Sequence, residues 1–165
     1  MKNLTFNTYL NNLLSTDEPA LNLILSQLSR QITYRKNDII YLRGRIPEQL
    51  SYIEKGNAIA LSQSKPNRQV LRFWITNQLI CPCGFFTNTP STHSIVALDD
   101  CLMSILNYRQ LFNFLNGFPE AYKIINAILE AEINLVELNI KNIHQNTSLQ
   151  NHEALLEALA LTFDE

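Results

Sequence analysis

The sequence predicts a mainly β protein with flanking α-helices, and three features of its 165 residues point to this fold class. Apolar residues recur at helical spacing near the start, short β-rich runs separated by turn residues follow, and helical spacing returns after Tyr108. Strands do not alternate with helices, so a parallel sheet is not expected. The middle of the chain is therefore predicted to form a small antiparallel barrel or sandwich.

Two short helices are predicted within residues 1–30. Apolar residues recur at helical spacing between Phe6 and Leu28. Thr16 precedes two acidic residues and Pro19, which is an order of residue types that begins a helix. The second helix is therefore expected to start near Pro19.

Six β-rich runs lie within residues 31–107, which we expect to form one β domain. Gly44 and Gly56 follow strands at tight reversals that need a positive φ, which glycine adopts at little cost. Asn77 is the residue type next best suited to that conformation. The predicted strands are Ile39–Leu42, Leu50–Glu54, Ala58–Leu61, Gln69–Ile75, His93–Leu98 and Cys101–Leu106.

Residues 108–165 are predicted to be helical, with a long helix over 119–143. Its apolar positions cover more than the single stripe that docks a helix on one surface, and several recur one heptad apart. A homodimer seam explains this pattern, and one broad face buried within the monomer is the alternative. A further amphipathic stretch runs from Leu149 to Phe163 and could cap the dimer or pack on the β domain. The predicted dimer interface consists of Ile125, Ile128, Leu129, Leu135, Val136 and Ile143.

Composition limits the partners of the chain. The formal net charge is -2 and the pI is about 5.9, so no overall basic field is available to hold a nucleic-acid backbone. The start of the chain lacks the apolar core of a secretion signal, and no run reaches membrane-spanning length. Three cysteines without a framework spacing indicate a reduced, cytoplasmic protein that does not associate with membranes.

The stretch from Arg35 to Leu61, RKNDIIYLRGRIPEQLSYIEKGNAIAL, resembles the opening of a cyclic-nucleotide-binding domain of Crp/Fnr-type bacterial transcription regulators. That family shows a turn, a short strand ending before a glycine, a loop, and an aromatic-rich strand running into a second glycine. The similarity continues through RFWITNQ and THSIVAL and covers about residues 6–143. It implies a double-stranded β-helix, or jelly-roll barrel, followed by a long dimerisation helix that begins near Pro119.

The resemblance also implies the place of a ligand site. In the family, a short helix after the sixth strand donates backbone N–H groups to the cyclic phosphate. A Gly-Glu pair at its start binds the ribose 2′-hydroxyl, and an arginine on the next strand neutralises the phosphate. In this chain the pair falls on Cys81 and Pro82 and the arginine on about Thr92. The implied, degenerate site comprises Ile80, Cys81, Pro82, Cys83, Gly84, Phe85, Thr92, His93 and Ser94.

These replacements argue against binding of cAMP or cGMP in the usual mode. A buried phosphate without its counter-charge loses several kcal/mol to desolvation. Pro82 offers neither a side-chain oxygen nor an N–H group. His93 could supply part of a cation, or make an ordinary local hydrogen bond. The remaining space could accept a different small-molecule effector or be filled by side chains.

Two of the three cysteines stand in this region, within QLICPCGFF. A metal site would recruit Cys81, Cys83, His93 and Cys101, but their spacing matches no common zinc pattern. Free cysteine otherwise packs as a small hydrophobe. We therefore expect packing, with no metal and no cofactor.

The functional prediction is a regulatory, sensor-like module for signal transduction and transcription regulation, and not an enzyme. The residues after Ile143 contain no Lys or Arg, so we expect no helix-turn-helix and no direct DNA binding by this chain. One alternative is a cupin-like small-molecule enzyme, which needs several histidines converging on a metal. Another is a structural interaction module with a filled pocket.

Overall fold

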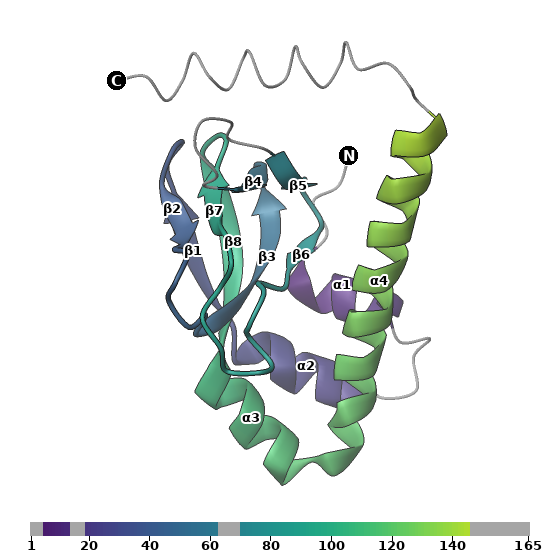
Figure 1. Cartoon of the computed structure of the whole chain (residues 1–165). Coiled ribbons are helices and arrows are strands. Elements are labelled where there is room, and N and C mark those ends of the chain that lie inside the picture. Colours follow the sequence, from purple (N-terminus) through teal and green to yellow (C-terminus); the bar gives the residue numbers. More distant parts are fainter. Residues whose placement is uncertain (1–4, 14–18, 63–69, 146–165) are drawn as a thin grey trace. The chain divides into compact units, whose positions relative to one another are not determined.

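The computed structural model describes residues 5–13, 19–62 and 70–145, with side chains described up to residue 137 (Figure 1). The chain divides into two compact units, Met1–Ile128 and Leu129–Glu165. None of the helices in the described ranges is both long and apolar enough to span a membrane.

Two antiparallel four-stranded sheets form the centre of the first unit. The first has the strand order β1-β8-β3-β6, made of Arg30–Tyr34, Cys101–Asn107, Gln49–Lys55 and Leu79–Ile80. The second has the order β2-β7-β4-β5, made of Ile39–Tyr41, Ser94–Ala97, Ala58–Leu61 and Val70–Trp74. The predicted class, mainly β with flanking helices, is therefore confirmed.

The six predicted strands are all present, each within one residue of its expected ends. Two strands were not predicted. β1 shows the partly exposed pattern of a sheet edge, and β6 is only two residues long. Gly44, Gly56 and Asn77 have φ values of 77°, 103° and 71°, which confirms the predicted left-handed turn positions.

One apolar cluster lies between the two sheets and contains residues from both. Ile53 of β3 and Ile80 of β6 meet Trp74 of β5 and Ile95 of β7 there. The other members are Ile40, Tyr41, Ala58, Ala60, Ala97, Cys101, Met103 and Ile105.

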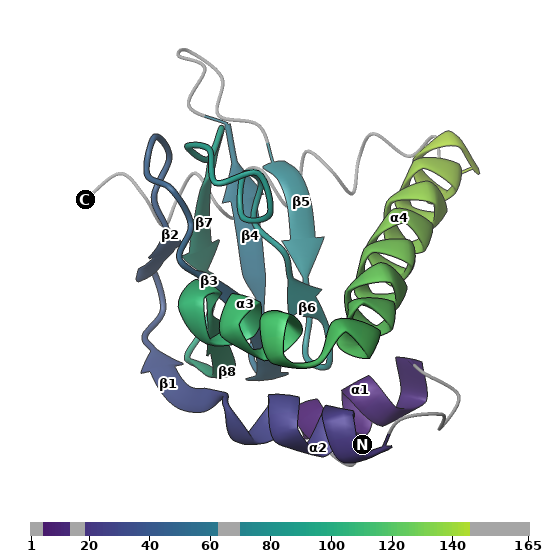
Figure 2. The same cartoon turned by 90° about the horizontal axis from the view of Figure 1, so that it is seen from below.

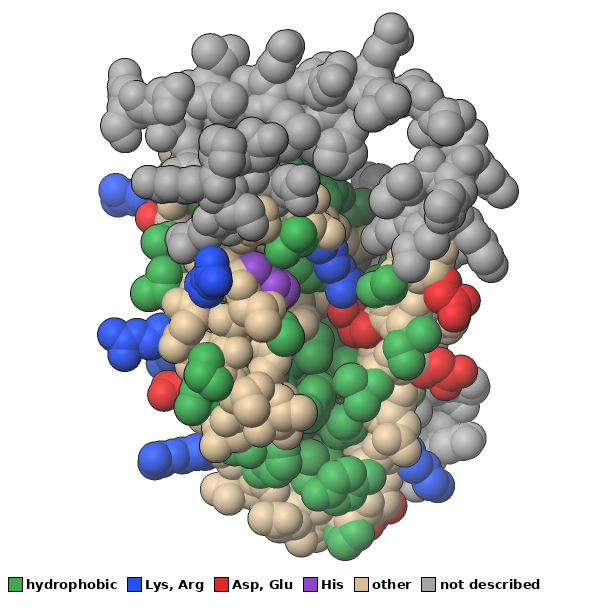
Figure 3. All heavy atoms as spheres, in the orientation of Figure 1, with side chains coloured by type: hydrophobic (Ala, Val, Ile, Leu, Met, Phe, Trp, Pro, Cys, Tyr) green, Lys and Arg blue, Asp and Glu red, His purple; other side chains and the backbone are tan. Residues whose placement is uncertain are grey.

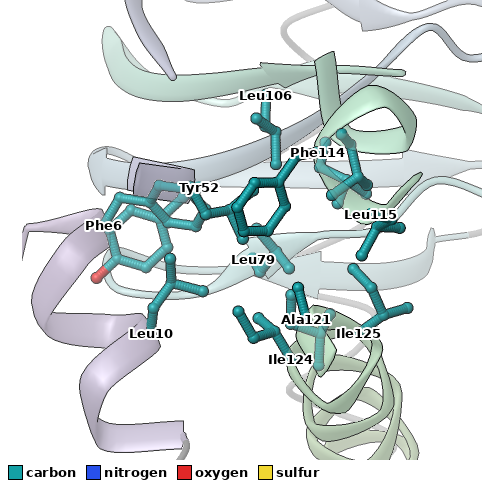
Figure 4. Close-up of a cluster of buried hydrophobic side chains, with 14 of the residues drawn as sticks. Phe6, Leu10, Tyr52, Leu79, Leu106, Phe114, Leu115, Ala121, Ile124 and Ile125 are labelled. Carbon is teal, nitrogen blue, oxygen red and sulfur yellow. The ribbon is translucent and has the colours of Figure 1, made fainter. Parts of the chain in front are cut away.

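A second cluster joins the opposite face of the first sheet to the helices (Figure 4). Leu50 and Tyr52 alternate along β3 with Ser51 and Ile53, so they point away from the space between the sheets. Phe6 and Leu10 of α1 (Phe6–Leu13) approach Tyr52 and Leu79 from one side, and Phe114, Leu115, Ile124 and Ile125 approach from the other. This cluster fixes α1 and α2 (Pro19–Gln27) on the β domain, and α2 and α3 lie at one end of the sheets (Figure 2).

Helix α3 (Tyr108–Gly117) begins directly after β8. Asn107 caps it, because its side-chain oxygen accepts a hydrogen bond from the Arg109 backbone N–H at 2.9 Å. A short 3-10 turn, η1 (Pro119–Ala121), then leads into α4 (Tyr122–Gln145). The long helix expected over 119–143 is thus formed by η1 and α4.

Candidate functional site

The segment between β6 and β7 is where the resemblance placed a ligand-binding helix, but the residues there form turns. Phe85 N–H donates to the Pro82 carbonyl at 3.2 Å, and Thr89 N–H donates to the Gly84 carbonyl at 3.0 Å. Gly84 has a φ of 90°, and a Cβ at this position would collide with the Thr89 carbonyl. The segment is therefore a tight loop that only glycine permits at its centre.

Aromatic side chains attach this loop to the helices. Phe85 is buried, and its ring lies 5.0 Å from that of Phe86 and 5.4 Å from that of Tyr108 on α3. Tyr108 continues the contact to Phe112 at 4.2 Å. Pro82 is buried as well, whereas Cys83 is exposed. The loop is thus held by packing rather than by polar groups directed at a ligand.

The polar residues at the start of β7 contact a neighbouring loop. Ser94 Oγ accepts from the Arg43 backbone N–H at 3.1 Å, and the Thr92 hydroxyl bonds His93 Nδ1 at 3.1 Å. Ser91 exchanges backbone hydrogen bonds of 2.8 and 2.9 Å with Gly44 and Arg45. These bonds join the loop after β2 to the segment before β7.

A cation does face the space between the sheets, but it comes from β5. Trp74 belongs to the cluster between the sheets, and Arg72 lies two residues earlier on the same face of the strand. The guanidinium carbon of Arg72 is 4.7 Å from the centroid of the Trp74 ring. Burial, and then the charge of Arg72, lower the pKa of His93. The alternation in QVLRFW was the signal that could have identified Arg72 from the sequence.

Large side chains occupy the space between the sheets. Tyr41 is buried, its hydroxyl lies 2.5 Å from Ser51 Oγ and donates to the Gln49 carbonyl, and burial raises its pKa. Ile80 and Trp74 are also buried. Trp74 Nε1 is buried and has no hydrogen-bond acceptor in the described part of the chain. The interior is therefore mostly filled.

A pocket of about 700 Å³ lies at the loop between β2 and β3, where Ile40 and Tyr41 of the cluster between the sheets form part of its wall. None of the predicted ligand-site residues lines it. Its walls include Tyr34, Tyr41, Arg45, Ile46, Pro47 and Pro90.

The cysteines do not lie together. Cys81 packs against the helix-side cluster, whereas Cys101 belongs to the cluster between the sheets. The Cys101 thiol donates to the Asn57 carbonyl at 3.2 Å, and burial raises its pKa to about 11. Among the described residues, no group of three or more His, Cys, Asp or Glu side chains could hold a metal ion.

The predicted dimer interface divides between a buried and an exposed part. Ile125 and Ile128 belong to the helix-side core of the monomer, with exposures of 5% and 1%, so their assignment to the interface is corrected. Leu129 and Val136 are exposed, Leu135 is half-buried, and the Ile143 side chain lies outside the described residues. Tyr122 and Ile133, which were not predicted, extend the exposed apolar line along α4.

Comparison with known proteins gives the family. The cyclic nucleotide-binding domain family matches residues 31–117, which is more than half of the chain. No match is found among curated proteins.

Several solved structures share the fold. A cyclic nucleotide-binding domain from Methylobacillus flagellatus KT has a TM-score of 0.71 and 13% identity, over 87% of this chain and 80% of that one. The N-terminal domain of a transcriptional regulator from Streptomyces coelicolor A3(2) has a TM-score of 0.62 and 18% identity, over 84% of this chain and 94% of that one.

Longer regulators match as well. The catabolite activator protein of Thermus thermophilus has a TM-score of 0.63 and 14% identity over 80% of this chain, which spans only 62% of that protein. The c-di-GMP responsive global regulator CLP of Xanthomonas campestris has a TM-score of 0.61 and 16% identity, over 86% of this chain and 72% of that protein. With the fold and the family match in agreement, the chain belongs to the cyclic nucleotide-binding domain family.

Proposed function

We propose that this chain is a cytoplasmic regulatory module with the jelly-roll arrangement of a Crp/Fnr sensor half, whose cyclic-nucleotide site has diverged. The observation that carries this proposal is the loop after β6, where Cys81 and Pro82 are followed by turns and no helix is formed. Such a module acts by binding and conformational change, without catalysis.

The loop lacks the chemistry that holds a cyclic phosphate. Pro82 has no N–H group and no side-chain oxygen, and Thr92, just before β7, carries no charge. Removing a phosphate from water without a counter-charge costs several kcal/mol. Arg72 cannot simply replace the missing arginine, because its guanidinium stacks on Trp74 from another strand. The site is therefore unsuited to cAMP or cGMP in the usual mode.

The helix α4 supports a homodimer. Its exposed apolar residues Tyr122, Leu129 and Val136 are each one heptad apart, and Ile133 lies beside them. Burying a Leu or Val side chain contributes about 1.5–3 kcal/mol relative to leaving it exposed. A second copy with the same line is the simplest partner for such a seam.

A structural module with a filled interior is the second candidate, and the packing between the sheets favours it. Tyr41, Trp74 and Ile80 occupy this space, and Arg72 lies over the Trp74 ring. A cupin-like enzyme has less support, because His93 is the one histidine between residues 31 and 107. The two non-catalytic candidates differ in whether a ligand changes the protein.

Thermal melting of the full chain tests the proposal, and a saturable shift with c-di-GMP alone would favour the regulatory module over the structural one. The ligands are cAMP, cGMP and c-di-GMP, the last because one structural neighbour is described as c-di-GMP responsive. A ligand at about 100 times its dissociation constant adds about 2.7 kcal/mol of stability. We expect no shift with cAMP or cGMP. A saturable shift with either one would show that the site still binds cyclic nucleotides, and would overturn the proposal.

A further inference from the structure

The pocket of about 700 Å³ at the loop between β2 and β3 has the size of a small-molecule site. Such sites typically enclose about 300–1,000 Å³. Every residue that lines this pocket belongs to the described part of the chain, and none of them belongs to the diverged cyclic-nucleotide site. A ligand bound here would therefore leave the loop after β6 untouched.

Ring side chains form much of the pocket wall. Tyr34 ends β1, Tyr41 ends β2, and Pro47 and Pro90 come from the loops before β3 and β7. Gln49 holds both tyrosines, because its backbone carbonyl accepts from the Tyr41 hydroxyl at 3.1 Å and its side-chain amide donates to the Tyr34 hydroxyl at 3.2 Å. Rings fixed in this way suit a ligand with a flat apolar body.

Backbone hydrogen bonds fix the loop that supplies the rest of the wall. Gly44 N–H donates to the Ser91 carbonyl at 2.8 Å, and Ser91 N–H donates to the Arg45 carbonyl at 2.9 Å. Near the other end of the loop, the Glu48 carbonyl accepts from Tyr108 N–H at 2.7 Å. The pocket is thus formed by the chain itself, so little ordering of the loop is left to oppose binding.

Two opposite charges line the pocket, Arg45 and Glu48. Both side chains are exposed, and within the described ranges neither of them forms an ion pair. One cation and one anion therefore remain for a ligand. A molecule that carries both a carboxylate and an ammonium group pairs with the two side chains together.

Positive charge predominates around β2. Lys and Arg side chains protrude along the left edge of the molecule in Figure 3, where β1 and β2 lie in Figure 1. Arg35, Lys36 and Arg43 are exposed on the segments that flank β2, together with the single acid Asp38. A field of this sign attracts the carboxylate end of an approaching ligand.

We infer that this pocket binds a small zwitterion with a flat apolar body, of which an aromatic α-amino acid is the simplest example. Arg45 binds the carboxylate and Glu48 binds the ammonium group. The apolar body lies against Ile46 and the ring side chains of the wall. This site goes beyond the proposed function and does not depend on it.

NMR titration of the isotope-labelled full chain with L-tryptophan tests the inference. The backbone amide signals of Gly44, Arg45, Ile46 and Glu48 are expected to shift saturably, with a dissociation constant of about 1 mM or below for a ligand of this size. The amide signal of Gly84, in the loop after β6, is the internal control and should not shift. Two truncated ligands are compared, tryptamine without the carboxylate and indolepropionate without the ammonium group.

Substitutions at the two charges tell their roles apart. Arg45→Gln is expected to weaken binding of L-tryptophan and indolepropionate about 2- to 5-fold and to leave tryptamine unchanged. Glu48→Gln should weaken binding of L-tryptophan and tryptamine by a similar factor and leave indolepropionate unchanged. Arg43→Gln is the matched control, because it removes an exposed cation of the same loop that does not line the pocket.

The apolar wall is tested by Ile46→Ser. Ile46 is 44% exposed, so this change should leave the chain folded. The affinity for all three compounds should fall about 3-fold or more, because each of them loses the same apolar contact. Leu71→Ser on β5 is the control, since Leu71 is 51% exposed and does not line the pocket.

The outcomes are distinct. Saturable shifts at the loop, with losses that follow the missing charge, support the inference. No saturable shift with L-tryptophan up to about 10 mM, ten times the expected dissociation constant, overturns it. Binding that Arg45→Gln and Glu48→Gln leave unchanged, or that shifts Gly84 instead of the loop, overturns it as well. Each of these results leaves the proposed function intact, because titrations with cyclic nucleotides test that function separately.

Discussion

The guanidinium carbon of Arg72 lies 4.7 Å from the centroid of the Trp74 ring, and both residues face the space between the sheets from β5. A cation over an indole face is attracted by the ring quadrupole, the more so when the pair is shielded from water. Trp74 is buried and Arg72 is half-buried, so the pair covers part of the space between the sheets with the chain's own side chains.

A double-mutant cycle measures the strength of this contact. With Arg72→Met and Trp74→Leu as the single changes, we expect a coupling of about 0.5–2 kcal/mol in the free energy of unfolding. Urea titration of the four proteins gives the value. Single effects that simply add would contradict an energetic role for the stacked pair.

His93 makes stability depend on pH. Burial and the charge of Arg72 lower its pKa below the usual value of 6.5, so the unfolded chain takes up a proton at higher pH than the folded one. The contribution of neutral His93 to the free energy of unfolding is therefore fully present above pH 6.5, the usual pKa. It is lost as the pH falls below 6.5 toward the lower pKa of the folded chain.

The variant His93→Gln isolates this contribution. Between about pH 7.5 and about pH 5.5 its free energy of unfolding should fall less than that of the parent chain. The NMR titration of the His93 ring in Arg72→Gln should show a partly restored pKa, since burial remains the larger cause. Equal pH dependence in parent and His93→Gln chains would contradict this account.

Two glycines with similar backbone angles should respond differently to alanine. At Gly44, φ is 77° and a Cβ would meet nothing within 4 Å, so Gly44→Ala should cost only the strain of about 1–2 kcal/mol. At Gly84 a Cβ would also collide with the Thr89 carbonyl, so Gly84→Ala should cost clearly more. Urea unfolding of the pair checks the order, and a reversed order would show that the loop after β6 is free to rearrange.

Substitutions on α4 should separate dimerisation from folding. Leu129→Glu with Val136→Glu changes two exposed side chains and should yield a folded monomer in sedimentation experiments. Ile128→Ala truncates a core side chain and should cost about 2–5 kcal/mol of stability without changing the assembly in the folded state. A dimer that survives the two glutamates would rule out this face as the seam.

The sequence predicted the strands well because their runs are short, β-rich and bounded by turn residues. β1 was missed because it is a partly exposed edge strand of five residues, of which only Ile32 and Tyr34 are apolar. β6 was missed because two residues carry no period. Both strands are defined by their pairing with β8 and β3, and a local sequence pattern does not reveal such pairing.

The candidate site was less predictable for two physical reasons. Apolar residues occupy more than one stripe along α4, so their spacing alone could not show that Ile125 and Ile128 face the core. The position of Arg72 depends on which face of β5 turns inward, and that is decided by the pairing of Ala58 with Trp74. By contrast, the residue types at positions 82 and 92, on which the proposed loss of the phosphate site rests, could be read directly from the sequence.

Calorimetric titration of cAMP and cGMP into the full chain tests the central claim most directly, with the combined variant Cys81→Gly, Pro82→Glu and Thr92→Arg as the gain-of-binding comparison. The parent chain is predicted to give no saturable heat with either nucleotide. Saturable binding by the parent at micromolar concentrations, near -8 kcal/mol, would contradict the claim that its phosphate site has been lost.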